Sequence, residues 1–145
     1  MFQDEDYLYL IFSFTVAVTA CATGDRYNNN SVIRFPNIRA SYGINTLSTL
    51  QTFGKFTCEK PGLYLTIASI MTHLSDAEYQ IRKNGNTLVY VRIVPRFSGD
   101  QIQNHHTGTC SAVVFLSLCD TIDIHAVTDI YIHVGYSCLS IFKIH

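Results

Sequence analysis

The chain has 145 residues, of which 48% are hydrophobic, so it can bury a core of its own and needs neither a metal nor a disulfide simply to fold. Its formal net charge is −1, with 10 basic and 11 acidic residues, which excludes the basic surface on which nucleic-acid binding depends. Charged residues make up only 14% of the sequence, and so weakly charged a surface indicates a stable oligomer. We therefore expect a single domain over residues 1–145 that associates with copies of itself.

The first hydrophobic segment runs from Tyr7 to Ala22. It ends on small residues as a signal-peptide core does, but the flank before it, MFQDED, is acidic, whereas signal peptides carry a positive flank. The segment is too short to span a membrane comfortably, and it is rich in β-branched and aromatic residues. We interpret it as a buried strand and expect no membrane span.

Turn signals divide the rest of the sequence at short intervals. The polar stretch Asp25–Ser31 is the first loop, and Pro61-Gly62 has the composition of a tight turn. Asn84-Gly85 is the pair most typical of a two-residue hairpin. Pro95 begins a longer polar excursion that continues to Gly108.

Short segments rich in β-forming residues lie between these turns, and several alternate between apolar and polar residues, which predicts strands with one buried face. They are Val32–Phe35, Lys55–Cys58, Leu63–Met71, Glu78–Lys83, Thr87–Val94, Cys110–Leu118, Thr121–Val127, Ile130–Val134 and Leu139–Ile144. No window has the pattern of an amphipathic helix. About eight to ten short strands separated by turns predict an all-β sandwich or barrel.

One segment carries a specific motif. Residues 53–64 read F-G-K-F-T-C-x-x-P-G-x-Y, which resembles the G-x-F-T-C-x-x-P-G-x-Y-x-F signature of the globular head domain of complement component C1q and its relatives. The resemblance continues in order along the chain, at residues 11–14, 32–35, 83–85, 111–124 and 137–144.

The sequence also departs from the family pattern. Cys119 stands where the family has a glycine before its Asp-x-Val turn, and Tyr64-Leu65-Thr66 replaces Tyr-x-Phe. The terminal F-S-G-F of the family is L-S-I-F here, at residues 139–142. The chain therefore resembles a divergent member of the family. It contains no Gly-X-Y run, so no collagen stalk lies within it.

The resemblance implies a two-sheet jelly-roll sandwich of about ten antiparallel strands, of the kind shared with tumour necrosis factor. It further implies a homotrimer, a secreted and extracellular protein, no cofactor, and a pattern-recognition or lectin-like role in innate immunity. The ligand would be a glycan, a microbial surface or a protein. A structural or matrix trimer and a tumour-necrosis-like receptor ligand are the alternatives, although the F-T-C-x-x-P-G motif favours the complement-type branch over the latter.

The five cysteines are an odd number, so at least one thiol is free or paired between chains. No C-x-x-C pair is present, which argues against a structural zinc site, and we expect most of the cysteines to be small buried side chains. Cys58 alternates with Phe56 in a predicted strand, so we expect it to be buried and unreactive. A hydrolase built from Cys58, His73 and Asp76 has no supporting nucleophile elbow, and we expect no enzyme activity.

Ligand contacts are expected on loops, which can present polar groups without interrupting the sandwich. The two long polar loops are Asp25–Ser31 and Arg96–Thr107, unless both are merely solvated or packed at the edge of the trimer. The candidate ligand-binding residues are Arg96, Asp100, His105 and His106.

The same loops contain residues typical of a metal site and of a glycosylation site. Adjacent residues of an extended chain face opposite ways, so His105 and His106 are not expected to share a metal ion, and no metal site is predicted. Asn29, in the sequon Asn29-Asn30-Ser31, is a candidate glycosylation site if the protein is secreted, and an unmodified loop residue otherwise.

Overall fold

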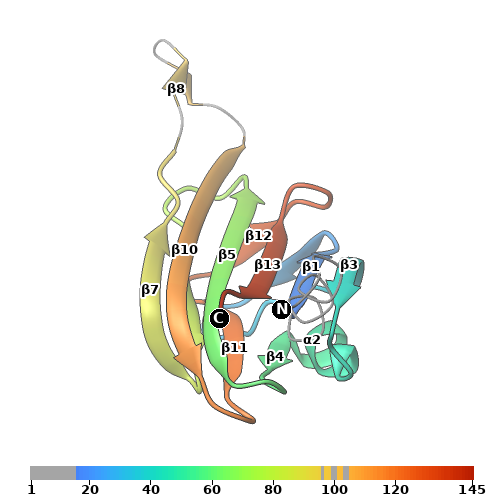
Figure 1. Ribbon diagram of the computed structural model, residues 1–145. Coiled ribbons are helices and arrows are strands. Elements are labelled where there is room, and N and C mark those ends of the chain that lie inside the picture. Colours follow the sequence, from blue (N-terminus) through green and yellow to red (C-terminus); the bar gives the residue numbers. More distant parts are fainter. Residues whose placement is uncertain (1–15, 96, 99–100, 103–104) are drawn as a thin grey trace, which may run out of the picture.

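The computed structural model describes residues 16–95, 97–98, 101–102 and 105–145, which form two main antiparallel sheets (Figure 1). One sheet has the strand order β10-β5-β13-β1-β3, and the other has the order β4-β11-β6-β7. The chain passes repeatedly between the two sheets, because strands that follow one another in sequence are seldom neighbours in space. This is the predicted all-β, two-sheet jelly-roll sandwich.

The elements have the following bounds. The first sheet consists of β1 (Ala17–Cys21), β3 (Asn37–Tyr42), β5 (Gly62–Thr72), β10 (His106–Leu116) and β13 (Cys138–Lys143). The second sheet consists of β4 (Lys55–Thr57), β6 (Glu78–Lys83), β7 (Asn86–Arg92) and β11 (Thr121–Ala126). Two small pairs, β2 (Asp25–Tyr27) with β12 (Ile130–Ile132) and β8 (Phe97–Ser98) with β9 (Gln101–Ile102), and the helix α2 (Leu47–Phe53) complete the described elements.

The core lies between the sheets and is filled by alternate residues of the strands. In β5 every second side chain, from Tyr64 to Ile70, is buried, while the residues between them face outward and are half-buried. A side chain on Gly108 of β10 would meet Ile93 Cγ1 at 2.7 Å and Val91 Cγ1 at 3.1 Å. Glycine at this position therefore allows β10 to pass close to β7 and the segment that follows it.

Most of the predicted strands are present with small changes at their ends, and β6 has the predicted bounds. The prediction for Val32–Phe35 is wrong, because this segment makes only an isolated bridge from Val32 to His125. The predicted absence of a helix is wrong at α2, and β3 was not predicted. In the predicted segment 7–22, residues 17–21 form β1, and residues 7–15 lie outside the described residues.

One ion pair is buried between β6 and β11. Asp123 and Arg82 are cross-strand partners, and Arg82 donates from Nε to Oδ1 at 2.7 Å and from Nη2 to Oδ2 at 2.9 Å. Asp123 is 2% exposed. The two-pronged geometry satisfies both carboxylate oxygens, so the pair is tolerated in the interior.

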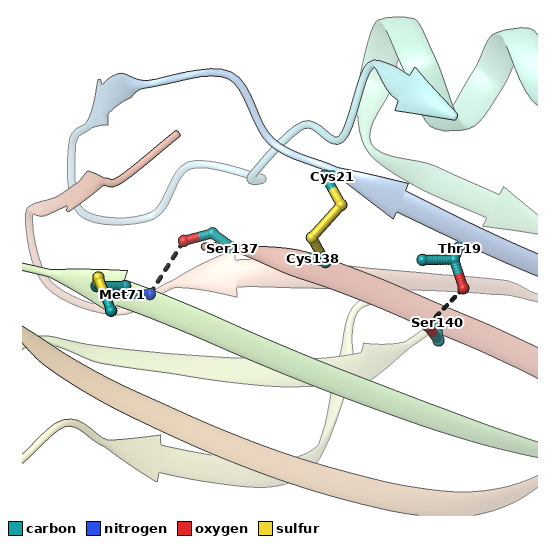
Figure 2. Close-up of a disulfide and its surroundings, with 6 residues drawn as sticks. All are labelled: Thr19, Cys21, Met71, Ser137, Cys138 and Ser140. Atoms are coloured by element: carbon teal, nitrogen blue, oxygen red, sulfur yellow. Dashed lines mark hydrogen bonds between the residues drawn. A yellow bond between two sulfur atoms is a disulfide. The ribbon is translucent and has the colours of Figure 1, made fainter. Parts of the chain in front are cut away.

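The five cysteines separate into one disulfide and three free thiols. Cys21 of β1 and Cys138 of β13 are direct cross-strand partners and form a disulfide (Figure 2). Of the free cysteines, Cys58 is buried, Cys110 is half-buried and Cys119 is exposed. The predicted burial of Cys58 is confirmed, and its lack of reactivity stays a prediction.

Candidate assembly face and recognition pocket

The outer face of the five-stranded sheet carries a continuous row of apolar side chains. The strand register places Val113, Leu65, Phe142, Ala17 and Tyr42 next to one another across all five strands. We call these residues the apolar row. A surface of this kind in a soluble protein marks an interface more often than it marks open solvent.

The edge strand β10 adds an exposed knob at one end of this row. Val113 is 61% exposed, and Phe115, two residues further along the same face, is 60% exposed. Phe115 is the cross-strand partner of Leu63, which extends the apolar surface toward the start of β5. We call Val113 and Phe115 the apolar knob.

A hollow of about 320 Å³ lies at the other end of the same face, over β13, β1 and β3. Ala17, Ala40, Tyr42 and Phe142 are among the residues that line it. The knob and the hollow therefore lie on the same face of the sheet but at its two opposite edges. One chain cannot fill its own hollow with its own knob.

Hydrogen bonds and a disulfide link the strands next to the apolar row. Thr19 and Ser140 hydroxyls lie 2.8 Å apart, and Ser137 Oγ accepts a hydrogen bond from the Met71 backbone N–H at 3.0 Å (Figure 2). The Cys21–Cys138 disulfide lies beyond Thr19 and Ser140 along the same two strands. These contacts hold β1, β13 and β5 together beneath the apolar row.

A second hollow, of about 420 Å³, lies away from this face, between β2, the segment that follows it, and α2. We call it the arginine pocket, because two guanidinium groups line it. Its lining consists of Arg26, Tyr27, Asn28, Ser31, Val32, Arg34, Thr52 and Phe53.

The end of α2 is fixed against the wall of the arginine pocket by a glycine. Gly54 has a positive φ of 71°, and a side chain there would meet Ile33 O at 2.3 Å and Val32 Cγ1 at 2.9 Å. Its N–H caps the helix by donating to Leu50 O at 3.0 Å. This close approach places Phe53, which is 64% exposed, at the pocket.

The two arginines keep most of their hydrogen-bonding capacity. Arg26 Nη2 lies 3.4 Å from Asp129 Oδ2, and Arg34 Nη2 lies 3.8 Å from a carboxylate oxygen of Asp25. All four side chains of these pairs are exposed, so the pairs are weak. Arg34 is held over the Tyr27 ring, with Cζ 6.0 Å from the ring centroid.

The structure describes two of the four predicted ligand-binding residues, His105 and His106. Arg96 and Asp100 lie outside the described residues. His105 is exposed, whereas His106 is 1% exposed and points into the sandwich from β10. The expected opposite orientation of the two histidines is therefore found, and a surface contact by His106 would need the core to open.

His105 belongs to an aromatic cluster that sequence reasoning missed. Its ring packs edge-on against His133 at 4.2 Å between centroids, and His73 lies 4.8 Å from Tyr131 and 6.5 Å from His133. Desolvation, and then the proximity of His105 and His73, lowers the pKa of His133. Tyr131 and His133 are two residues apart at the end of β12, but His73 follows β5 and His105 precedes β10, so no local pattern could have shown the whole cluster.

Asn29 lies on an exposed loop beside the arginine pocket. Its backbone N–H donates to Asp129 Oδ1 at 2.9 Å, and its neighbours Asn28 and Ser31 line the pocket. Glycosylation at Asn29 stays a prediction.

No hydrolytic arrangement is formed by Cys58, His73 and Asp76. Cys58 lies beside Tyr64 near the start of β5, with Sγ 3.9 Å from the tyrosine hydroxyl, whereas His73 follows the end of that strand. Eight residues of strand separate the two ends by about 26 Å. Burial raises the pKa of the Cys58 thiol, which disfavours the nucleophilic thiolate.

Among the described residues, no group of three or more His, Cys, Asp or Glu side chains is arranged to hold a metal ion. In the same part of the chain, no helix is long and apolar enough to cross a membrane.

Comparison of the sequence with protein-family models gives no match, and comparison with curated proteins gives no significant one. Solved structures do match. Eiger TNF from S. frugiperda has a TM-score of 0.65 at 12% identity, over 90% of this chain and 93% of that one. The globular domain of zebrafish complement 1qA protein has a TM-score of 0.62 at 13% identity, over 90% and 97%. Murine APRIL at pH 5.0 has a TM-score of 0.69 at 12% identity, over 90% and 99%.

These structural matches each cover 90% of this chain. Because the sequence identities are low, the matches are evidence about the fold alone. They include both C1q and tumour necrosis factor structures at similar scores, so the specific C1q family suggested by the sequence motif is not distinguished from its tumour necrosis factor relatives. The chain has a jelly-roll fold similar to those of the C1q and tumour necrosis factor structures.

Proposed function

We propose that the protein is a non-enzymatic, secreted recognition module that acts as a homotrimer, with a pattern-recognition or lectin-like role in innate immunity. The observation that carries the assembly part of this proposal is the outer face of the five-stranded sheet, with its apolar knob on β10 and its hollow over β13, β1 and β3. Proteins with this fold are generally non-enzymatic and typically assemble as trimers.

The positions of the knob and the hollow favour a head-to-tail contact between copies of the chain. A contact between unlike patches is head-to-tail, and such a contact either closes into a cyclic oligomer or continues as a filament. Insertion of Val113 and Phe115 of one copy into the hollow of the next covers the apolar row. Three copies close the ring in the assembly typical of this fold.

The disulfide supports the extracellular part of the proposal. Disulfides persist in oxidising compartments and are rare in the cytosol, and the Cys21–Cys138 bond together with this fold is consistent with an extracellular domain.

A tumour-necrosis-like receptor ligand is the second candidate. It is supported by the likenesses in fold to Eiger TNF and to APRIL, whose TM-scores are similar to that of the complement 1qA domain. Screening the purified protein against a glycan array separates a recognition module, which retains specific glycans, from a receptor ligand or a structural trimer, which does not.

The variant Phe115→Asp is expected to convert the trimer into monomers, because it puts a charge into the centre of an apolar contact. Sedimentation equilibrium should give three times 16.3 kDa for the native protein and 16.3 kDa for the variant. Tyr90→Asp is the matched control, since Tyr90 is 70% exposed but belongs to β7 in the other sheet, and it should leave the trimer intact. A trimeric Phe115→Asp protein would contradict the assigned face.

A further inference from the structure

We propose that the arginine pocket binds a carboxylate-bearing sugar residue of an acidic glycan. This inference rests on the proposed recognition function and names the ligand class for it. The pocket's lining residues come from β2, the segment that follows it and the end of α2, and none belongs to the apolar row. Ligand binding and assembly therefore use different surfaces and can be tested separately.

The size of the pocket suits a ligand of one or two sugar rings. Its volume of about 420 Å³ lies toward the lower end of the range of roughly 300–1,000 Å³ found for small-molecule sites. The hollow is shallow and open to solvent, so a pyranose would rest against its lining residues rather than be enclosed by them.

The two guanidinium groups supply the charge recognition. Arg26 and Arg34 line the same hollow, and each has one carboxylate neighbour among the described residues, at 3.4 Å and 3.8 Å. Planar guanidinium groups bind carboxylates through paired N–H donors at shorter distances than these. A bound carboxylate would therefore give each arginine a better partner than the one it has.

The remaining side chains suit the rest of a sugar. The exposed ring of Phe53 offers a flat apolar surface on which the C–H face of a pyranose can stack. Asn28, Ser31 and Thr52 offer amide and hydroxyl groups that can bond to sugar hydroxyls. Aromatic and short polar groups around a charged centre are the composition of a small-ligand site.

The pocket is organised before any ligand enters. Tyr27 is buried, it lies under the Arg34 guanidinium, and its hydroxyl accepts a hydrogen bond from the Arg34 backbone N–H at 3.2 Å. Gly54 fixes the end of α2 against residues 32–33, and Gln51 Nε2 donates to Pro36 O at 3.2 Å. The backbone around the pocket and the Tyr27 ring are therefore held in place before binding, which favours affinity.

An acidic peptide is the competing ligand, because glutamate side chains also carry carboxylates. Extended peptides usually bind along a groove or a free sheet edge, where their backbone is paired. The arginine pocket instead places the exposed ring of Phe53 beside two arginines, and a flat apolar surface next to positive charge suits the carboxylate and C–H face of a sugar.

The test is isothermal titration of the native protein with three probes: a glucuronate-containing oligosaccharide, its glucose-containing counterpart, and poly-glutamate. We expect the glucuronate probe to bind at least about tenfold more tightly than the neutral one, since charged hydrogen bonds distinguish them. Poly-glutamate binding as tightly as the glucuronate probe would show a site for acidic peptides and overturn the proposal. The titrations are repeated with Asn29→Gln, because a glycan attached at Asn29 could block the pocket. Absence of glucuronate binding in both the native protein and this variant would also overturn the proposal.

Variants assign the binding to the pocket. The double variant Arg26→Gln/Arg34→Gln should lose at least about tenfold in affinity for the glucuronate probe, because charged hydrogen bonds are lost. Arg92→Gln is the matched control, since Arg92 is an equally exposed arginine with a carboxylate neighbour at 3.3 Å, on β7. Unchanged binding by the double variant, or an equal loss in Arg92→Gln, would overturn the assignment.

Light scattering on the same samples separates this inference from the proposed function. A trimer that retains other glycans on an array but not glucuronate overturns the ligand class alone. A monomer that binds glucuronate through Arg26 and Arg34 supports the pocket and overturns the proposed trimer.

Discussion

Replacing Cys21 and Cys138 together by alanine is expected to destabilise the folded protein by about 4–5 kcal/mol, the stabilisation expected for a disulfide that closes a loop of roughly 100 residues. The two cysteines are 117 residues apart in sequence but are direct partners on β1 and β13. The bond restricts the unfolded chain over most of its length, and its removal returns that conformational freedom to the unfolded state.

Chemical denaturation at a fixed protein concentration measures this loss, because the stability of an oligomer depends on concentration. Cys119→Ser is the control, since Cys119 is an exposed free thiol and its replacement should leave the midpoint nearly unchanged. Reduction of the native protein should reproduce the effect of the double variant. A double variant as stable as the native protein would contradict a formed disulfide.

Asp123→Ala is expected to cost about 3–5 kcal/mol of stability, the effect found when one partner of a buried ion pair is removed. Asp123 accepts two hydrogen bonds from Arg82 across the β6–β11 pair. Its loss leaves the Arg82 guanidinium in a mostly buried site without its carboxylate partner.

Asp76→Asn is the control for this variant, because Asp76 has a positive φ of 59°, which asparagine tolerates and alanine does not. Asp76 also pairs with an arginine, at 3.3 Å from Arg92, but both side chains are exposed, so the expected change is about 0–1 kcal/mol. Urea denaturation of the two variants under the same conditions compares them directly. Similar losses of stability in both variants would show that the contribution of the Arg82–Asp123 pair to stability does not depend on its burial.

The strands with the clearest alternation could be predicted from the sequence. The strictly alternating residues Thr121–Ala126 form β11, and the alternating segment Thr87–Val94 contains most of β7. β3 escaped prediction because it buries no residue fully, with only Ile38 half-buried against the core. α2 escaped because it has seven residues and one buried side chain, Leu50, which is too short a pattern to repeat.

The candidate sites could be predicted only in part. The polar loop at residues 25–31 was expected to carry ligand contacts, and Arg26, Asn28 and Ser31 do line the arginine pocket. Its other wall comes from Phe53 and Thr52, whose approach depends on the packing of Gly54 against residues 32–33.

The assembly face depends on strand register rather than on local sequence. The apolar row joins residues from Ala17 to Phe142, and their alignment is fixed by four separate strand pairings. The disulfide partner of Cys21 is also determined by strand register. Five cysteines allow several pairings, and the sequence alone does not choose among them. A motif of a few residues contains none of this long-range information.

The head-to-tail trimer is tested most directly by cysteines introduced at its two contacting patches, Val113→Cys on the knob and Tyr42→Cys in the hollow, in a Cys119→Ser background. Within one chain these positions are four strands apart, about 19 Å at the usual spacing, so they cannot form a disulfide with each other. Mild oxidation followed by denaturing electrophoresis without reductant should give covalently linked trimers. Chains that remain single, or a ladder that continues beyond three copies, would contradict the account.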